Sequence, residues 1–176
     1  MENIHEIELR PSEIGSYSCL AVAFEYITGR SRTDIINHSD YIIENGGLNI
    51  DILLRITDSL GIGTKVVCTE FGATYYNSDG DFADIVTNEE LQTLLAEYPA
   101  IVTDRHDNLI VDEVIIIEHA YAYIGDLQLD PEFGQHHPNR NRPITGAILF
   151  EDFTVDSCVK KIEEQSKAFK EEQAIK

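Results

Sequence analysis

Cys19 is the residue of this chain best placed to act as a nucleophile. It follows a loop that contains Gly15 and Ser16, and it opens the apolar run CLAVAFEYIT, which predicts a helix over residues 18–28. The free N–H groups and the positive dipole end of a helix N-terminus both stabilise a thiolate. The competing interpretation is a small buried cysteine in the core. A histidine within reach would favour the nucleophile, because imidazole can take and return the thiol proton.

His119 is the candidate base, because it is the one histidine inside a strongly predicted strand, EVIIIEHAYAYI. A two-residue turn at Gly125-Asp126 would bring the following segment back along this strand. Side chains on a strand alternate, so His119, Tyr121 and Asp130 would share one face, with Asp130 diagonal to His119. A carboxylate there could accept the imidazole N–H and fix its tautomer. A hydrogen-bonded core histidine beside an ordinary turn fits the same spacing.

The elements that must position these residues change type along the chain. Helices are expected first, with one strand among them, and strands follow from residue 100. This order predicts an α+β domain over residues 1–155, with N-terminal helices packed on an antiparallel β-sheet. The expected helices are residues 18–28, 33–37, 50–61 and 88–98. The expected strands are residues 64–69, 100–103, 113–124, 127–130 and 146–150. Residues 71–84 are expected to form an acidic loop, and residues 134–143 a linker.

Composition and charge limit the classes of partner. The chain has 176 residues, enough for one domain, and a 43% hydrophobic fraction typical of folded proteins. Its 32 acidic and 13 basic residues give a net charge of −19, which argues against nucleic acid and membrane surfaces as partners. Residues 156–176 hold equal numbers of acids and lysines and predict a charged C-terminal helix. The excess of negative charge therefore lies in residues 1–155. A basic peptide or protein segment would fit this body.

The N-terminus and the remaining cysteines and histidines suggest no special compartment or cofactor. The start, MENIHEIELRP, lacks a basic region followed by an apolar run, so a cytoplasmic protein is expected. Cys68 and Cys158 have no basic neighbour in the sequence and are interpreted as structural. His136 and His137, even with His106, lack the spacing of a zinc site. No metal and no cofactor are expected.

The ordered set of features resembles the papain-like cysteine peptidases. It is most similar to the compact bacterial branch that cleaves bacteriocin leader peptides at double-glycine sites. The resemblance implies a papain-like fold in which Cys19 is the nucleophile, His119 the base and Asp130 its orienting acid, acting through a thioester acyl-enzyme. The matching segments span about residues 12–134 and are SYSCLAVAFEYITG, GGLNIDILLRITDSLGIGTKVV, EELQTLLAEYPAIV, EHAYAYIG and LQLDPEFG.

The chain departs from that family at the oxyanion site. The family carries a Gln about six residues before the cysteine, and its side-chain amide donates to the oxyanion; this chain has Glu13 there. An ionised Glu cannot donate, and loss of one oxyanion donor costs about 100–1,000-fold in rate. The Cys19 backbone N–H would remain, with a second donor drawn from Ser12, Ser16, Tyr17 or Ser18.

The expected activity is hydrolysis of an amide bond in a peptide or protein. The same three residues could instead deamidate a glutamine or transfer an acyl group, because the outcome depends on which acceptor enters the site. A papain-like module that binds a peptide or partner protein without turnover is the alternative of another class. Glu13 favours that alternative, and the presence of Cys19, His119 and Asp130 together favours the enzyme.

Overall fold

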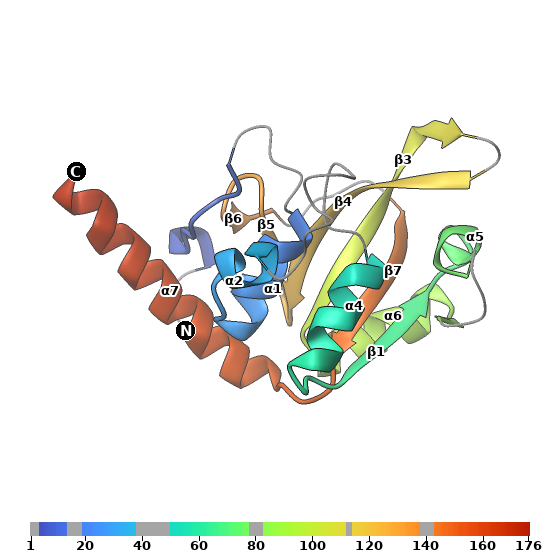
Figure 1. Ribbon diagram of the computed structural model, residues 1–176, viewed down its shortest axis with the longest axis horizontal. Coiled ribbons are helices and arrows are strands. Elements are labelled where there is room, and N and C mark those ends of the chain that lie inside the picture. The colour runs from blue at the N-terminus through green and yellow to red at the C-terminus, as the bar shows by residue number, and fades with distance from the viewer. Residues whose placement is uncertain (1–3, 14–18, 38–49, 78–82, 112–113, 138–142) are drawn as a thin grey trace.

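The computed structural model describes residues 4–13, 19–37, 50–77, 83–111, 114–137 and 143–176. These residues form helices and one mostly antiparallel sheet (Figure 1), so the expected α+β class is confirmed. The helices are η1 (Ile4–Glu6), α1 (Cys19–Thr28), α2 (Arg32–Asn37), α4 (Ile50–Ser59), α5 (Ala73–Tyr76), α6 (Asn88–Glu97) and α7 (Val155–Ile175).

The sheet of the described residues has seven strands in the order β2-β1-β7-β3-β4-β5-β6. Neighbouring strands are antiparallel except β1 and β2, which are parallel. Chain neighbours β3, β4, β5 and β6 follow one another across one half of the sheet. The strands are β1 (Thr64–Cys68), β2 (Asp84–Ile85), β3 (Ala100–Val111), β4 (Val114–Ile124), β5 (Leu127–Asp130), β6 (Gln135–His136) and β7 (Ile144–Phe150).

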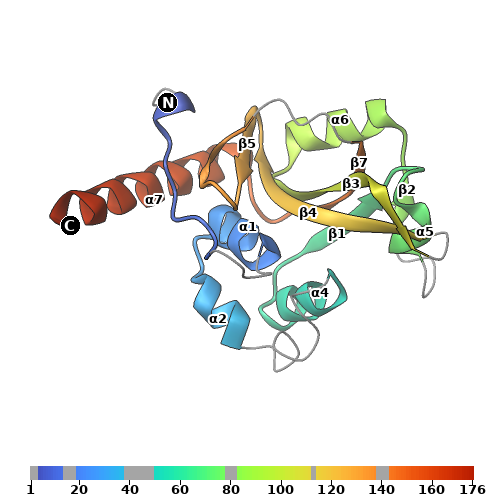
Figure 2. The same cartoon turned by 90° about the horizontal axis from the view of Figure 1, so that it is seen from above.

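The two faces of the sheet are covered by different helices. Figure 2 shows α1, α2 and α4 on one side of the strands and α6 on the other. The larger hydrophobic cluster joins α1 and α4 to side chains such as Ile101, Ala122 and Ile148, and the smaller one joins Leu91 and Leu95 of α6 to the opposite face. Burial of apolar side chains on both faces makes the sheet the central layer of the domain.

Local sequence signals set the ends of several elements. Thr87 caps α6 by accepting a hydrogen bond from the backbone N–H of Glu90, and Pro99 follows the helix. Gly125 has φ +59° in the turn between β4 and β5. This left-handed conformation suits glycine and allows the two-residue connection that pairs Ile124 with Leu127.

Helix α7 packs on the body rather than extending away from it. Cys158, Ile162 and Ser166 are buried along one side of the helix, which contacts α1 and β4. Thr154 and Ser157 form a reciprocal capping box at its start. Within the described parts of the chain, no helix is both long and apolar enough to cross a membrane.

Three segments differ most from the sequence expectation. Strand β3 does not stop at Thr103 but continues to Val111, because β4 pairs with this extension at Ile110 and Val111. The segment expected as an acidic loop contains α5 and β2. The expected linker begins with β6, which pairs with β5.

Candidate functional site

Cys19 is the first residue of α1 and is half-buried. The helix after it is almost entirely apolar, and Leu20, Ala21, Val22, Ala23 and Phe24 are all buried. Burial of this run fixes α1 against the strands, including β3 and β4. The thiol therefore lies at the end of a rigid helix, where the backbone N–H groups have no partners within the helix itself.

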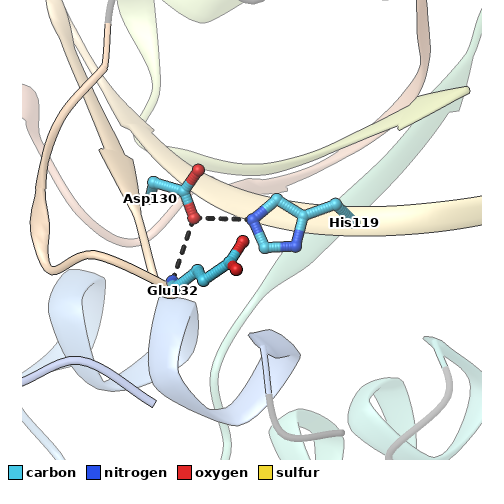
Figure 3. Close-up of side chains that lie close together, drawn as sticks. All are labelled: His119, Asp130 and Glu132. Carbon is cyan, nitrogen blue, oxygen red and sulfur yellow. Dashed lines mark hydrogen bonds and ion pairs between the residues drawn. The ribbon is translucent and has the colours of Figure 1, made fainter. Parts of the chain in front are cut away.

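His119 and Asp130 form the polar centre of the site, as Figure 3 shows. The Nε2 of His119 lies 2.7 Å from Oδ1 of Asp130 and donates a hydrogen bond to it. The same carboxylate oxygen accepts the backbone N–H of Glu132 at 2.9 Å. The side chains of His119 and Asp130 are 14% and 4% exposed. The imidazole is thus held in one orientation by a nearly buried carboxylate that is itself fixed by the backbone.

The electrostatic surroundings of His119 favour its protonated form. Burial alone lowers the pKa of His119, but the hydrogen bonds with Asp130 and Cys19 and the charges of both outweigh it. Together they raise the pKa of His119 from 6.5 to about 9. Since Nε2 bonds Asp130, Nδ1 is the nitrogen left for the Cys19 thiol. The histidine therefore links the cysteine to the aspartate.

The pairing of β3 with β4 has a register shift next to His119. Asp104 pairs with His119, but the next residue of β3, Arg105, pairs with Ile117, so β4 carries one extra residue there. Such bulges bend a strand and change the direction of nearby side chains. Tyr121 packs in the cluster beneath α6, whereas His119 reaches Cys19 of α1 on the other side. The two side chains therefore have different neighbours, although the pairing of β3 with β4 is regular from Tyr121 to His119.

The N-terminal segment connects the cysteine helix to the turn after Asp130. Its backbone N–H groups at Leu9 and Ser12 donate to the carbonyl oxygens of Gly134 and Pro131, each at 2.7 Å. On its other side the segment is held by α1 and α2. Tyr26 donates its hydroxyl proton to the carbonyl of Arg10 at 2.7 Å, and Arg32 donates to the carbonyls of Arg10 and Pro11 at 2.6 Å.

The structure describes only part of the expected oxyanion region. Glu13 is exposed, and Ser16, Tyr17 and Ser18 lie outside the described residues. The other two cysteines are far from solvent: Cys68 and Cys158 are buried, and burial raises the pKa of both thiols. This burial agrees with the structural role expected for them.

Glu132 is a site residue that motif reasoning missed. Its carboxylate, the Asp130 carboxylate and a His119 ring nitrogen each offer a ligand atom within 4.8 Å of the others. No motif marks Glu132; counting residues back from the two-residue turn places it opposite His119. This donor set is of a kind that binds metal ions. His119 and Asp130 are already hydrogen-bonded to each other, and no metal is proposed.

Comparison of the chain with models of known protein families, with characterised proteins and with solved structures finds no significant match.

Proposed function

We propose that this chain is a papain-like thiol hydrolase that cleaves an amide bond in a peptide or protein. Cys19 is the nucleophile, His119 the acid and base, and Asp130 the residue that orients His119. The observation that carries the proposal is the position of His119, which bonds Asp130 through Nε2 at 2.7 Å and also interacts with the thiol of Cys19. Nucleophile, base and orienting acid are the three parts that such a reaction needs.

The proposed reaction has two halves. The Cys19 thiolate attacks the carbonyl carbon, forming a C–S bond and placing the carbonyl electron pair on oxygen. When the tetrahedral intermediate collapses, the C–N bond breaks and the leaving amine takes a proton from His119. His119 then removes a proton from water, which attacks the thioester and releases the carboxylic acid product and Cys19.

The oxyanion formed in each half requires hydrogen-bond donors. The backbone N–H of Cys19, at the first position of α1, is one such donor, and the helix dipole adds favourable charge there. Glu13 is not suited to be the second donor, because an ionised carboxylate only accepts hydrogen bonds.

The arrangement of elements also supports the papain-like assignment. The cysteine begins a buried helix, the histidine lies on a central strand facing that helix end, and the aspartate ends the next strand of an antiparallel sheet. This is the order expected from the resemblance in sequence.

The first test is the rate of Cys19 alkylation by iodoacetamide as a function of pH. We expect a rate plateau that extends below about pH 6, because a thiolate paired with imidazolium remains reactive where an ordinary thiol of pKa about 8.5 is protonated. The Cys19→Ala variant identifies the labelled site, since Cys68 and Cys158 are buried. Replacement His119→Ala should remove the plateau. A single rise near pH 8.5 that His119→Ala leaves unchanged would overturn the proposal.

The second test is turnover. A peptide library should yield new termini with wild-type protein and none with Cys19→Ala. Release of ammonia without new termini would instead indicate glutamine deamidation. Rapid alkylation combined with tight peptide binding and no product would favour the module that binds without turnover.

A further inference from the structure

We propose that Glu132 forms a subsite for a cationic side chain, Lys or Arg, next to the amide bond that is cleaved. This inference rests on the proposed function, because it names a substrate preference for the same site. The starting observation is that the Glu132 carboxylate lies within reach of both His119 and Asp130 (Figure 3). Asp130 is buried, but Glu132 is exposed, so solvent and substrate can reach the Glu132 charge.

The backbone around Glu132 is held firmly, so the fold sets the point from which its side chain extends. Its N–H donates to Oδ1 of Asp130 at 2.9 Å. The N–H groups of Phe133 and Gly134 both donate to the Asp130 carbonyl, at 3.2 and 2.7 Å. These bonds form a tight turn that begins at Asp130 and places Glu132 at the rim of the site.

The other charged groups of the site do not neutralise the Glu132 carboxylate. His119 already interacts with the Cys19 thiol, and the buried Asp130 bonds its Nε2 at 2.7 Å. Among the described residues, no hydrogen bond or ion pair engages the Glu132 carboxylate. The net charge of −19 adds a field that draws cations to the protein. A Lys or Arg side chain of a substrate would supply the missing partner.

Phe133 provides an apolar surface on the same turn. Its side chain is 56% exposed, although large apolar side chains of the described residues are mostly buried. It stacks on His137 with ring centroids 6.3 Å apart. Lys and Arg carry long aliphatic stems, and their charged groups are attracted to aromatic faces. Phe133 therefore complements Glu132 in recognising a long cationic side chain.

The direct test compares two thiol reagents that differ in charge. Cys19 is modified with methanethiosulfonates bearing either a trimethylammonium or a sulfonate group, and the ratio of the two rates is measured. For wild-type protein, the rate with the cationic reagent divided by the rate with the anionic reagent should be well above the same ratio for a free cysteine. Glu132→Gln should lower this ratio by about tenfold, since a single charge several ångströms away contributes at that level at intermediate dielectric. Molar salt should lower the wild-type ratio as well.

A matched control separates the local charge from the net charge. Glu89 is an exposed acid in the first turn of α6, on the other face of the sheet (Figure 2). Glu89→Gln changes the net charge by the same amount and should leave the ratio within about twofold of wild type. If Glu132→Gln and Glu89→Gln behave alike, the inference is wrong.

Substrate cleavage provides the second arm. Peptides with Lys or Arg beside the cleaved bond should be preferred over the same peptides with Glu, and Glu132→Lys should reverse this preference. Cleavage without a charge preference would overturn the subsite and leave the hydrolase intact. If no peptide is cleaved, the reagent ratio still decides the question of the subsite, because it needs only an accessible Cys19 thiol.

Discussion

The backbone N–H of Ser12 donates a 2.7 Å hydrogen bond to the carbonyl oxygen of Pro131, the residue that follows Asp130. In the same segment, the carbonyl of Arg10 accepts a hydrogen bond from Tyr26 of α1, the helix that begins with Cys19. The nucleophile's helix and the acid that orients the base are therefore both bonded to this segment. A second bond of the same length, from Leu9 to Gly134, extends that connection. Distortion of the turn should therefore change the geometry of the site as well as stability.

Gly134→Ala tests this connection. Gly134 has φ +67°, and a Cβ added there would lie 2.0 Å from the Leu9 carbonyl oxygen, so the two segments must separate. We expect a loss of about 1–3 kcal/mol in the free energy of unfolding and a slower alkylation of Cys19 at pH 6. Gly61→Ala is the control, because Gly61 has φ +70° with nothing within 4 Å of the added Cβ. Gly61→Ala should lower the free energy of unfolding through the left-handed backbone conformation alone, with no change in the rate of Cys19 alkylation.

Two substitutions at Asp130 separate orientation from charge. In Asp130→Asn, the amide oxygen can still accept the Nε2–H of His119, but the negative charge is lost. The pKa of His119 should therefore fall from about 9, and the alkaline limb of the pH–rate profile should move to lower pH with it. Asp130→Ala removes the acceptor too and should lower activity further. Equal pH profiles for wild type and Asp130→Asn would contradict the assigned role.

The raised pKa of His119 also predicts how stability changes with pH. The folded protein holds this proton more tightly than the unfolded chain, whose histidine has a pKa near 6.5. The stabilisation is fully present below pH 6.5 and is lost as pH rises through about 9. The buried Cys68 and Cys158 thiols act in the same direction at higher pH. Urea unfolding from pH 6 to 9.5 should show a smaller decline for His119→Gln than for wild type.

The sequence predicted those parts of the fold that local chemistry determines. A two-residue turn with glycine at positive φ sets the register of β4 and β5, so the pairing of Ile124 with Leu127 followed from counting residues. The N-terminus of α6 followed from acidic residues in its first turn, and its end from Pro99. Helix α1 followed from an almost entirely apolar run.

Features set by distant partners were not predictable in this way. The polar stretch at 104–108 gave no reason to extend β3 beyond Thr103; the extension follows from pairing with β4. The register shift beside His119 has no local signal either. Counting from the turn places Glu132 opposite His119, but no local signal shows that its carboxylate approaches the imidazole and the Asp130 carboxylate.

The sequence does not show whether the C-terminal helix packs on the body. The structure shows where α7 packs and so predicts the loss of stability when that contact is disturbed. Ile162 is fully buried in the main hydrophobic cluster, where α7 meets α1, the helix that carries Cys19. Ile162→Ala removes buried methyl groups and leaves a cavity, so the free energy of unfolding should fall by about 2–4 kcal/mol. Ile175 lies on the same helix but is 88% exposed, and Ile175→Ala should change stability by less than about 0.5 kcal/mol. Chemical denaturation of both variants checks this. Equal stability of the two would mean that α7 does not pack on α1 in solution, and α1 would then be held by the sheet, α2 and α4 alone.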